Sequence, residues 1–178
     1  MAKFFGNLHL VLATGLVLAI ILIVSFTGWT GDNAEAVANA VLRWMHLFFG
    51  VVWIGLLYYL NFVQVPTMPK VPAELKKGVT GYIAPQVLFF FRYGAQALTF
   101  QGIGADGTNL IGIGMWLAII MASNVWFVIW PAQKKILGLV EASDEAKAKA
   151  APVALIASRT NVILSLPMFY AMVSANMG

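Results

Sequence analysis

The sequence predicts an all-α integral membrane protein, a helical bundle of five transmembrane helices whose N-terminus is cytoplasmic. Three observations predict it. The 178 residues are 61% hydrophobic and only 10% charged, whereas about one quarter of the residues of an average soluble domain are charged. Five apolar stretches are long enough to cross a bilayer, and the lysines are confined to three parts of the chain. A soluble globule, a disordered chain and a nucleic-acid-binding module are therefore excluded, despite a net charge of +4.

Each predicted span is a mostly apolar stretch of about 20 residues, the length that crosses a hydrocarbon core of about 30 Å. The spans cover residues 8–27, 42–63, 83–100, 111–130 and 153–173, within one transmembrane domain of residues 1–178. The first stretch exceeds the apolar core of a signal peptide, roughly 7–15 residues, so we interpret it as an uncleaved span. Pro131 is predicted to end the fourth span. Ser143 is predicted to begin a short helix that Pro152 separates from the fifth span.

The positions of the lysines predict the orientation. They lie at the N-terminus, after the second span and after the fourth span: Lys3, Lys70, Lys76, Lys77, Lys134, Lys135, Lys147 and Lys149. The loops after the first and third spans hold acidic residues but no lysine or arginine. Because cytoplasmic loops are enriched in basic residues, the N-terminus is predicted to be cytoplasmic and the C-terminus external. Pro85 and Gly102 bracket a short third span, but without it the two lysine-rich loops would face opposite sides.

One face of the second span carries a histidine. His46, Gly50, Trp53, Leu57 and Asn61 follow one another in steps of four, three, four and four residues, which places them on one side of a helix. A histidine on such a face is a candidate axial ligand for the iron of a b-type haem, with Gly50 and Trp53 bordering the cofactor. A histidine that hydrogen-bonds to a neighbouring helix, beside a glycine that permits close packing, explains the same pattern. Both interpretations stay open.

Two arginines lie inside predicted spans without an acidic partner. Arg92 is seven residues after Pro85 and Arg159 is seven residues after Pro152, so both lie about 10 Å inside the cytoplasmic boundary. No aspartate or glutamate occurs within any predicted span, and an intramembrane charge is expected to be paired or to face a polar cavity. The missing anion would be a lipid phosphate, a haem propionate or an anionic substrate.

Amide side chains occur at the same predicted depth as these arginines. Asn61 lies near the end of the second span, Asn124 lies in the inner half of the fourth, and Asn161 follows Arg159 closely. Together with Arg92 and Arg159, these three asparagines form the predicted substrate-binding set, which suits a planar, oxygen-rich anion. Hydrogen bonding between helices is the alternative explanation. The tryptophans that share a face near this layer, and that would wall a flat ligand, are Trp126 and Trp130.

Four parts of the sequence carry a family resemblance. They are residues 43–46 with 53–59, residues 91–95, residues 124–135, and residues 158–161 with 165–168. Over roughly residues 40–175 the chain resembles the membrane domain of PuuD-type bacterial urate oxidases, the urate oxidase N-terminal family. The most specific parts are WPAQKK at 130–135 and SRTN at 158–161. The resemblance implies a multi-pass helical domain of the bacterial inner membrane that is linked to urate oxidation.

The chain differs from longer members of that family, which carry more membrane helices and a C-terminal cytochrome c domain. It stops after the fifth predicted span and has no cysteine, which covalent haem attachment through C-x-x-C-H requires. The resemblance therefore implies a short form without the cytochrome c domain. Electrons would pass to a separate cytochrome c or a quinone, and the partners would be the lipid bilayer and other membrane subunits.

Three functions are compatible with these residues. The first is a membrane oxidoreductase domain in which the two arginines bind a planar anion, the three asparagines hydrogen-bond its edge, and a haem on His46 relays electrons. The second is a non-catalytic subunit of a larger membrane complex, in which the same face packs on a partner or on lipid. The third is a transporter, a weaker interpretation because neither inverted repeats nor intramembrane acids are visible.

Overall fold

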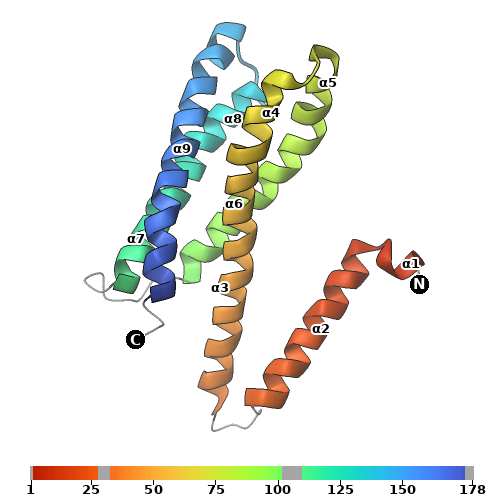
Figure 1. Cartoon of the computed structure of the whole chain (residues 1–178), viewed down its shortest axis with the longest axis vertical. Helices are drawn as coiled ribbons and strands as arrows, with labels where there is room; N and C mark the ends of the chain where they lie inside the picture. The colour runs from red at the N-terminus through yellow and green to blue at the C-terminus, as the bar shows by residue number, and fades with distance from the viewer. Residues whose placement is uncertain (1, 28–32, 102–109, 175–178) are drawn as a thin grey trace. The chain divides into compact units, whose positions relative to one another are not determined.

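The computed structural model describes residues 2–27, 33–101 and 110–174, and the secondary structure in these ranges is helical throughout (Figure 1). The chain divides into two compact units, residues 1–47 and residues 48–178. The division falls inside one helix, α3 (Ala34–Tyr58). His46 therefore belongs to the first unit, whereas Gly50 and Trp53 belong to the second.

The first unit contains α1 (Ala2–Phe5), α2 (Leu8–Thr27) and the beginning of α3. Asn7 caps α2, because its side-chain oxygen accepts hydrogen bonds from the backbone N–H groups of His9 and Leu10 at 3.1 and 3.3 Å. The bounds of α2 coincide with the first predicted span, and its mostly apolar side chains are distributed over all sides of the helix. At about 1.5 Å per residue its 20 residues match the thickness of a hydrocarbon core.

The second unit contains the rest of α3 and the helices that follow. They are η2 (Tyr59–Gln64), α4 (Val65–Thr67), η3 (Met68–Lys70), α5 (Ala73–Gly78), η4 (Val79–Ile83), α6 (Ala84–Gln101), α7 (Leu110–Asn124), η5 (Val125–Ile129), α8 (Trp130–Ile136) and α9 (Asp144–Ser174). The long helix α9 lies alongside α7 and α8, and α6 packs on α7 (Figure 1). The candidate site lies on these packed helices.

The core of the second unit joins α3, α6, α7, η5 and α9. Its largest fully buried apolar side chains are Trp53, Phe91, Leu57, Met121 and Val125. Gly94 on α6 sets the closest approach to α3, because a Cβ atom added there would lie 3.2 Å from the Cβ of Trp53. A glycine at this point lets the backbone of α6 pack directly on the tryptophan.

Three π-helical turns allow the helices to pass prolines. The turns η2, η4 and η5 each end two residues before a proline, which is Pro66, Pro85 or Pro131. The residue between turn and proline donates its backbone N–H five residues back: Val65 to Leu60, Ala84 to Val79, and Trp130 to Val125. A proline ring clashes with the carbonyl four residues before it. The wider π-helical turn moves that carbonyl aside, so the helix continues.

Two helix boundaries predicted at prolines are wrong, because the helix continues through the proline in both places. Pro131 does not end the fourth helical segment, since η5 precedes it and α8 continues to Ile136. Pro152 does not separate a short helix from the fifth span, because α9 runs through it without a break. The carbonyl that Pro152 leaves without a donor belongs to Ala148, an exposed residue. Water or lipid headgroups can therefore satisfy it.

The turn between α8 and α9 has regular caps at both sides. Gly138 adopts φ 71°, the left-handed conformation that closes a helix C-terminus, and the N–H of Leu139 donates to the carbonyl of Lys134 at 2.9 Å. The helix start predicted at Ser143 is confirmed, because the Ser143 hydroxyl oxygen accepts a hydrogen bond from the N–H of Ala146 at 3.2 Å.

Four helical segments in the described ranges are long and apolar enough to cross a membrane: Leu8–Phe26, Ala34–Lys70, Leu110–Ile136 and Asp144–Ser174. They contain the first, second, fourth and fifth predicted spans. The third predicted span forms α6, which is helical as expected but is not among the four. Because α6 carries Arg92 and Gln96, its crossing rests on the distribution of lysines, and the count of five spans stays a prediction.

The predicted orientation can be tested by cysteine labelling. The chain has no cysteine, so each of the variants Asn33→Cys, Leu75→Cys and Leu139→Cys carries a single reactive site. We expect Leu75→Cys and Leu139→Cys, at exposed positions, to react with a membrane-impermeant maleimide from the cytoplasmic side only. Asn33→Cys should react only from the outside. Labelling of positions 75 and 139 from opposite sides would show that α6 does not cross the membrane.

Candidate functional site

A layer of buried and half-buried polar side chains lies inside the second unit. We call it the polar layer, and it consists of Asn61, Asn124, Ser158 and Asn161. Asn61 and Asn161 are 1% and 0% exposed, although they lie in helical segments apolar enough to cross a membrane. Such burial is tolerated only when the polar atoms are hydrogen-bonded.

The polar layer joins α7 to α9 through two amides, each of which donates a hydrogen bond to the other helix. Asn124 donates from Nδ2 to the Oδ1 of Asn161 at 2.8 Å and to the carbonyl of Ala157 at 2.8 Å. Asn161 donates from Nδ2 to the carbonyl of Met121 at 3.0 Å. Both N–H groups of Asn124 are thereby used. These two residues were predicted to bind a substrate, and the structure brings them together as a clamp between two helices.

Asn61 connects η2 to α9 through its Nδ2, while its Oδ1 accepts no hydrogen bond from the described residues. Its Nδ2 donates to the Ser158 hydroxyl oxygen at 2.8 Å and to the carbonyl of Leu57 at 2.9 Å. Its Oδ1 is buried without a hydrogen-bond partner among the described residues, and so are the Oε1 of Gln64 and the Nε1 of Trp53. Of the three predicted asparagines, Asn61 is therefore the one with a buried acceptor still available.

A second hydrogen-bonded pair joins the last residue of α3 to α9. The hydroxyl oxygens of Tyr58 and Ser165 are 2.9 Å apart, and Ser165 donates its proton to the carbonyl of Val162 at 2.8 Å. Because a serine hydroxyl has a single proton, Tyr58 is the donor to Ser165. Ser158 and Ser165 were not in the predicted site, but their spacing of three and four residues from Asn161 places them on one face of α9.

Arg92 lies in a cluster of aromatic rings and a lysine. We call it the cation–aromatic cluster, and it consists of Arg92, Tyr93, Trp126, Trp130 and Lys134. The guanidinium carbon of Arg92 lies 3.3 Å from the centre of the Trp130 ring and 5.7 Å from that of Trp126. The Lys134 ammonium lies 5.8 Å from the same Trp130 ring. Both cations therefore lie within cation–π distance of the Trp130 indole.

The positive charge of the cation–aromatic cluster has no carboxylate partner in the part of the chain that the structure describes. The ion pairs found there join Lys147 to Asp144 and Lys149 to Glu145, both on α9. Arg92 uses its Nε to donate to the carbonyl of Leu88 at 3.0 Å. A guanidinium carries five N–H groups, and among the described residues no hydrogen bond uses the terminal nitrogens of Arg92, so these can bind an anion.

Arg159 does not share the burial of its neighbour Asn161. Two residues on a helix are about 200° apart, so the same depth does not give the same direction. Asn161 is fully buried between helices, whereas Arg159 is exposed on the other side of α9. A long arginine side chain there can extend to a membrane surface.

The predicted haem residues have different surroundings. His46 is half-buried in the first unit. In the second unit, a Cβ atom added to Gly50 would meet nothing within 4 Å, so space is open beside it. Trp53 is 1% exposed and packs against Gly94 in the core. Gly50 therefore has open space beside it, whereas Trp53 is a core residue.

These features define a class of protein. It is a helical protein whose helices include four that are long and apolar enough to cross a membrane, among the described residues, and it carries a polar layer and a cation–aromatic cluster. A family model described as urate oxidase N-terminal matches residues 83–178, more than half of the chain. The chain belongs to the urate oxidase N-terminal family, as the resemblance of its motifs predicts. Comparison with curated proteins and with solved structures found no match.

Proposed function

We propose that the chain is a membrane oxidoreductase domain that binds urate, or a similar planar purine anion, at the cation–aromatic cluster. The observation that carries the proposal is the family match, which covers α6, α7, η5, α8 and α9. All five residues of the cluster lie inside the matched segment. The proposed location is the bacterial inner membrane, since the helices suit a bilayer and the resemblance is to bacterial enzymes.

The chemistry of the cluster suits a flat anion. The face of the Arg92 guanidinium lies on Trp130, so its edge is left to donate two parallel hydrogen bonds to a ligand. Lys134 adds a second positive charge beside the same ring. An indole such as Trp126 offers a surface on which a purine ring can stack. Charge, planarity and paired donors together would favour a urate anion over a neutral purine.

The proposed reaction needs an electron acceptor. Hydroxylation of urate by water releases two electrons and two protons, and the electrons would pass to a separate cytochrome c or a quinone. A b-type haem held by His46 would supply one-electron transfer when bound. The unused Oδ1 of Asn61 would accept a hydrogen bond from a water molecule or from a ligand N–H. Arg159 would serve the same anion only if its exposed side chain reached it.

The spectrum and the urate response of the purified protein test this proposal. We expect a Soret band that is lost in His46→Ala, while His9→Ala retains it, because His9 lies exposed at the start of α2. We also expect urate to reduce a soluble quinone in the presence of the parent protein. A colourless protein of normal stability that neither binds urate nor reduces quinone would favour a non-catalytic subunit of a larger membrane complex.

A further inference from the structure

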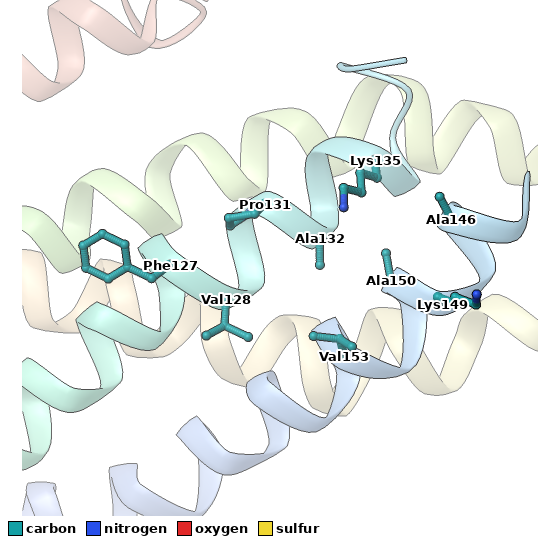
Figure 2. Close-up of a pocket in the computed structure, with 9 residues that line it drawn as sticks. All are labelled: Phe127, Val128, Pro131, Ala132, Lys135, Ala146, Lys149, Ala150 and Val153. Atoms are coloured by element: carbon teal, nitrogen blue, oxygen red, sulfur yellow. The ribbon is translucent and has the colours of Figure 1, made fainter. Parts of the chain in front are cut away.

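A groove lies between η5 and α8 on one side and the beginning of α9 on the other. Its volume is about 400 Å³ and it is open on one side. Figure 2 shows Lys135 and Lys149 at one end and Phe127 at the other, with Val128 and Val153 along the apolar part. The groove is thus basic at one end and apolar over the rest of its length.

The direction of this gradient follows from the course of the two helices. Before the connection between α8 and α9, Phe127 precedes Lys135 by eight residues, a rise of about 12 Å along the helix. After that connection, Lys149 precedes Val153 by four residues on α9. Both helices therefore place a lysine near the turn and an apolar side chain deeper in the membrane-spanning segment. A phospholipid has the same arrangement, with a charged headgroup at the boundary and an acyl chain below it.

The apolar part of the groove is accessible to a chain of methylene groups. Phe127 is 79% exposed, Val153 47% and Val128 39%. Ala132 and Ala150 lie between the lysine end and these side chains and are buried at 7% each. Because their side chains are small, they leave space in the groove for an acyl chain that contacts both helices.

The charges at the basic end favour an anion. Lys135 has no ion-pair partner among the described residues. Lys149 contacts Glu145 at 2.7 Å, but both side chains of that pair are 76% exposed. Exposed ion pairs contribute little to stability, so Lys149 can exchange the carboxylate for a phosphate.

We propose that this groove binds one anionic phospholipid, with its phosphate between Lys135 and Lys149 and one acyl chain along Phe127, Val128 and Val153. The site is distinct from the cation–aromatic cluster, which uses Lys134 rather than Lys135. A lipid bound there would hold α8 against α9 at the turn that joins them.

Lipid titration of the purified protein in neutral detergent tests the proposal, with bound lipid counted by native mass spectrometry. We expect phosphatidylglycerol to bind with one-to-one stoichiometry and Lys135→Gln/Lys149→Gln to weaken it about 30-fold, from the attraction of anionic lipid to two lysines. The matched control Lys70→Gln/Lys77→Gln, which removes two exposed lysines of the other basic region, should leave the affinity unchanged.

Two further ligands separate the lipid from its parts. Glycerol phosphate, which has the charge without acyl chains, should not compete, and phosphatidylcholine of the same chain length should bind much more weakly than phosphatidylglycerol. Equal affinity for the two lipids, equal effects of the two double variants, or full competition by glycerol phosphate would each overturn the proposal. Urate binding by the lysine variants should be normal, so failure here is distinguishable from failure of the proposed function.

Discussion

Replacing Arg92 by glutamine should remove most of the thermal stabilisation that urate gives to the detergent-solubilised protein. A ligand that binds the native state raises its apparent stability by an amount that grows with the logarithm of the ratio of ligand concentration to Kd. Hydrogen bonds to a charged group contribute about 1.5–3 kcal/mol, so we expect Arg92→Gln to weaken urate binding about 10- to 100-fold. Arg92→Lys should recover only part of this loss, because an ammonium group cannot stack on Trp130 or donate two parallel hydrogen bonds.

Two other arginine variants complete this experiment. Arg43→Gln is the matched control, since Arg43 is exposed on α3 in the first unit, and its urate response should equal that of the parent. Arg159→Gln tests the predicted second anion ligand. An unchanged response in Arg159→Gln would remove Arg159 from the site. A full response in Arg92→Gln would contradict the assignment of the substrate to the cation–aromatic cluster.

Replacing Asn161 by leucine should destabilise the protein by about 2 kcal/mol. Leucine has a similar size, but it deprives Asn124 of an acceptor and the carbonyl of Met121 of a donor. A buried polar group left unpaired costs about 1–3 kcal/mol, and hydrogen bonds between membrane helices average about 0.6 kcal/mol. Reversible unfolding in mixed detergent measures the free energy difference.

The control for Asn161→Leu is Asn39→Leu at an exposed position of α3, which should change stability by less than about 0.5 kcal/mol. The double variant Asn124→Leu/Asn161→Leu should cost clearly less than the sum of the single variants, because each single variant already breaks the bond between them. Additive effects would show that the two amides do not act as a clamp.

The helices were predictable because their signals are local. Long apolar stretches and capping residues act within a few residues of the helix they start or end, as Ser143 does for α9. The predictions at Pro131 and Pro152 failed because the outcome at a proline depends on what satisfies the carbonyl four residues earlier. Before Pro131 a π-helical turn moves that carbonyl aside, and before Pro152 the carbonyl belongs to the exposed Ala148. The presence of a proline alone predicts neither arrangement.

The candidate site was only partly predictable. Depth along a helix can be counted from the sequence, so Arg92, Asn61, Asn124 and Asn161 were correctly identified as polar residues within helices. The direction of each side chain around its helix depends on which neighbour packs there. Packing alone turned Asn124 toward Asn161, whereas it placed Arg92 on Trp130.

The sequence alone therefore specifies the helical class, the lysine pattern and the family of this chain, because composition, periodicity and motifs are properties of neighbouring residues. Only the tertiary structure shows that Asn124 and Asn161 hold α7 and α9 together, that Arg159 faces away from Asn161, and that two lysines border a groove beside α8. The bond between Asn124 and Asn161 joins residues 37 positions apart, and the geometry of such contacts is set by how the helices pack.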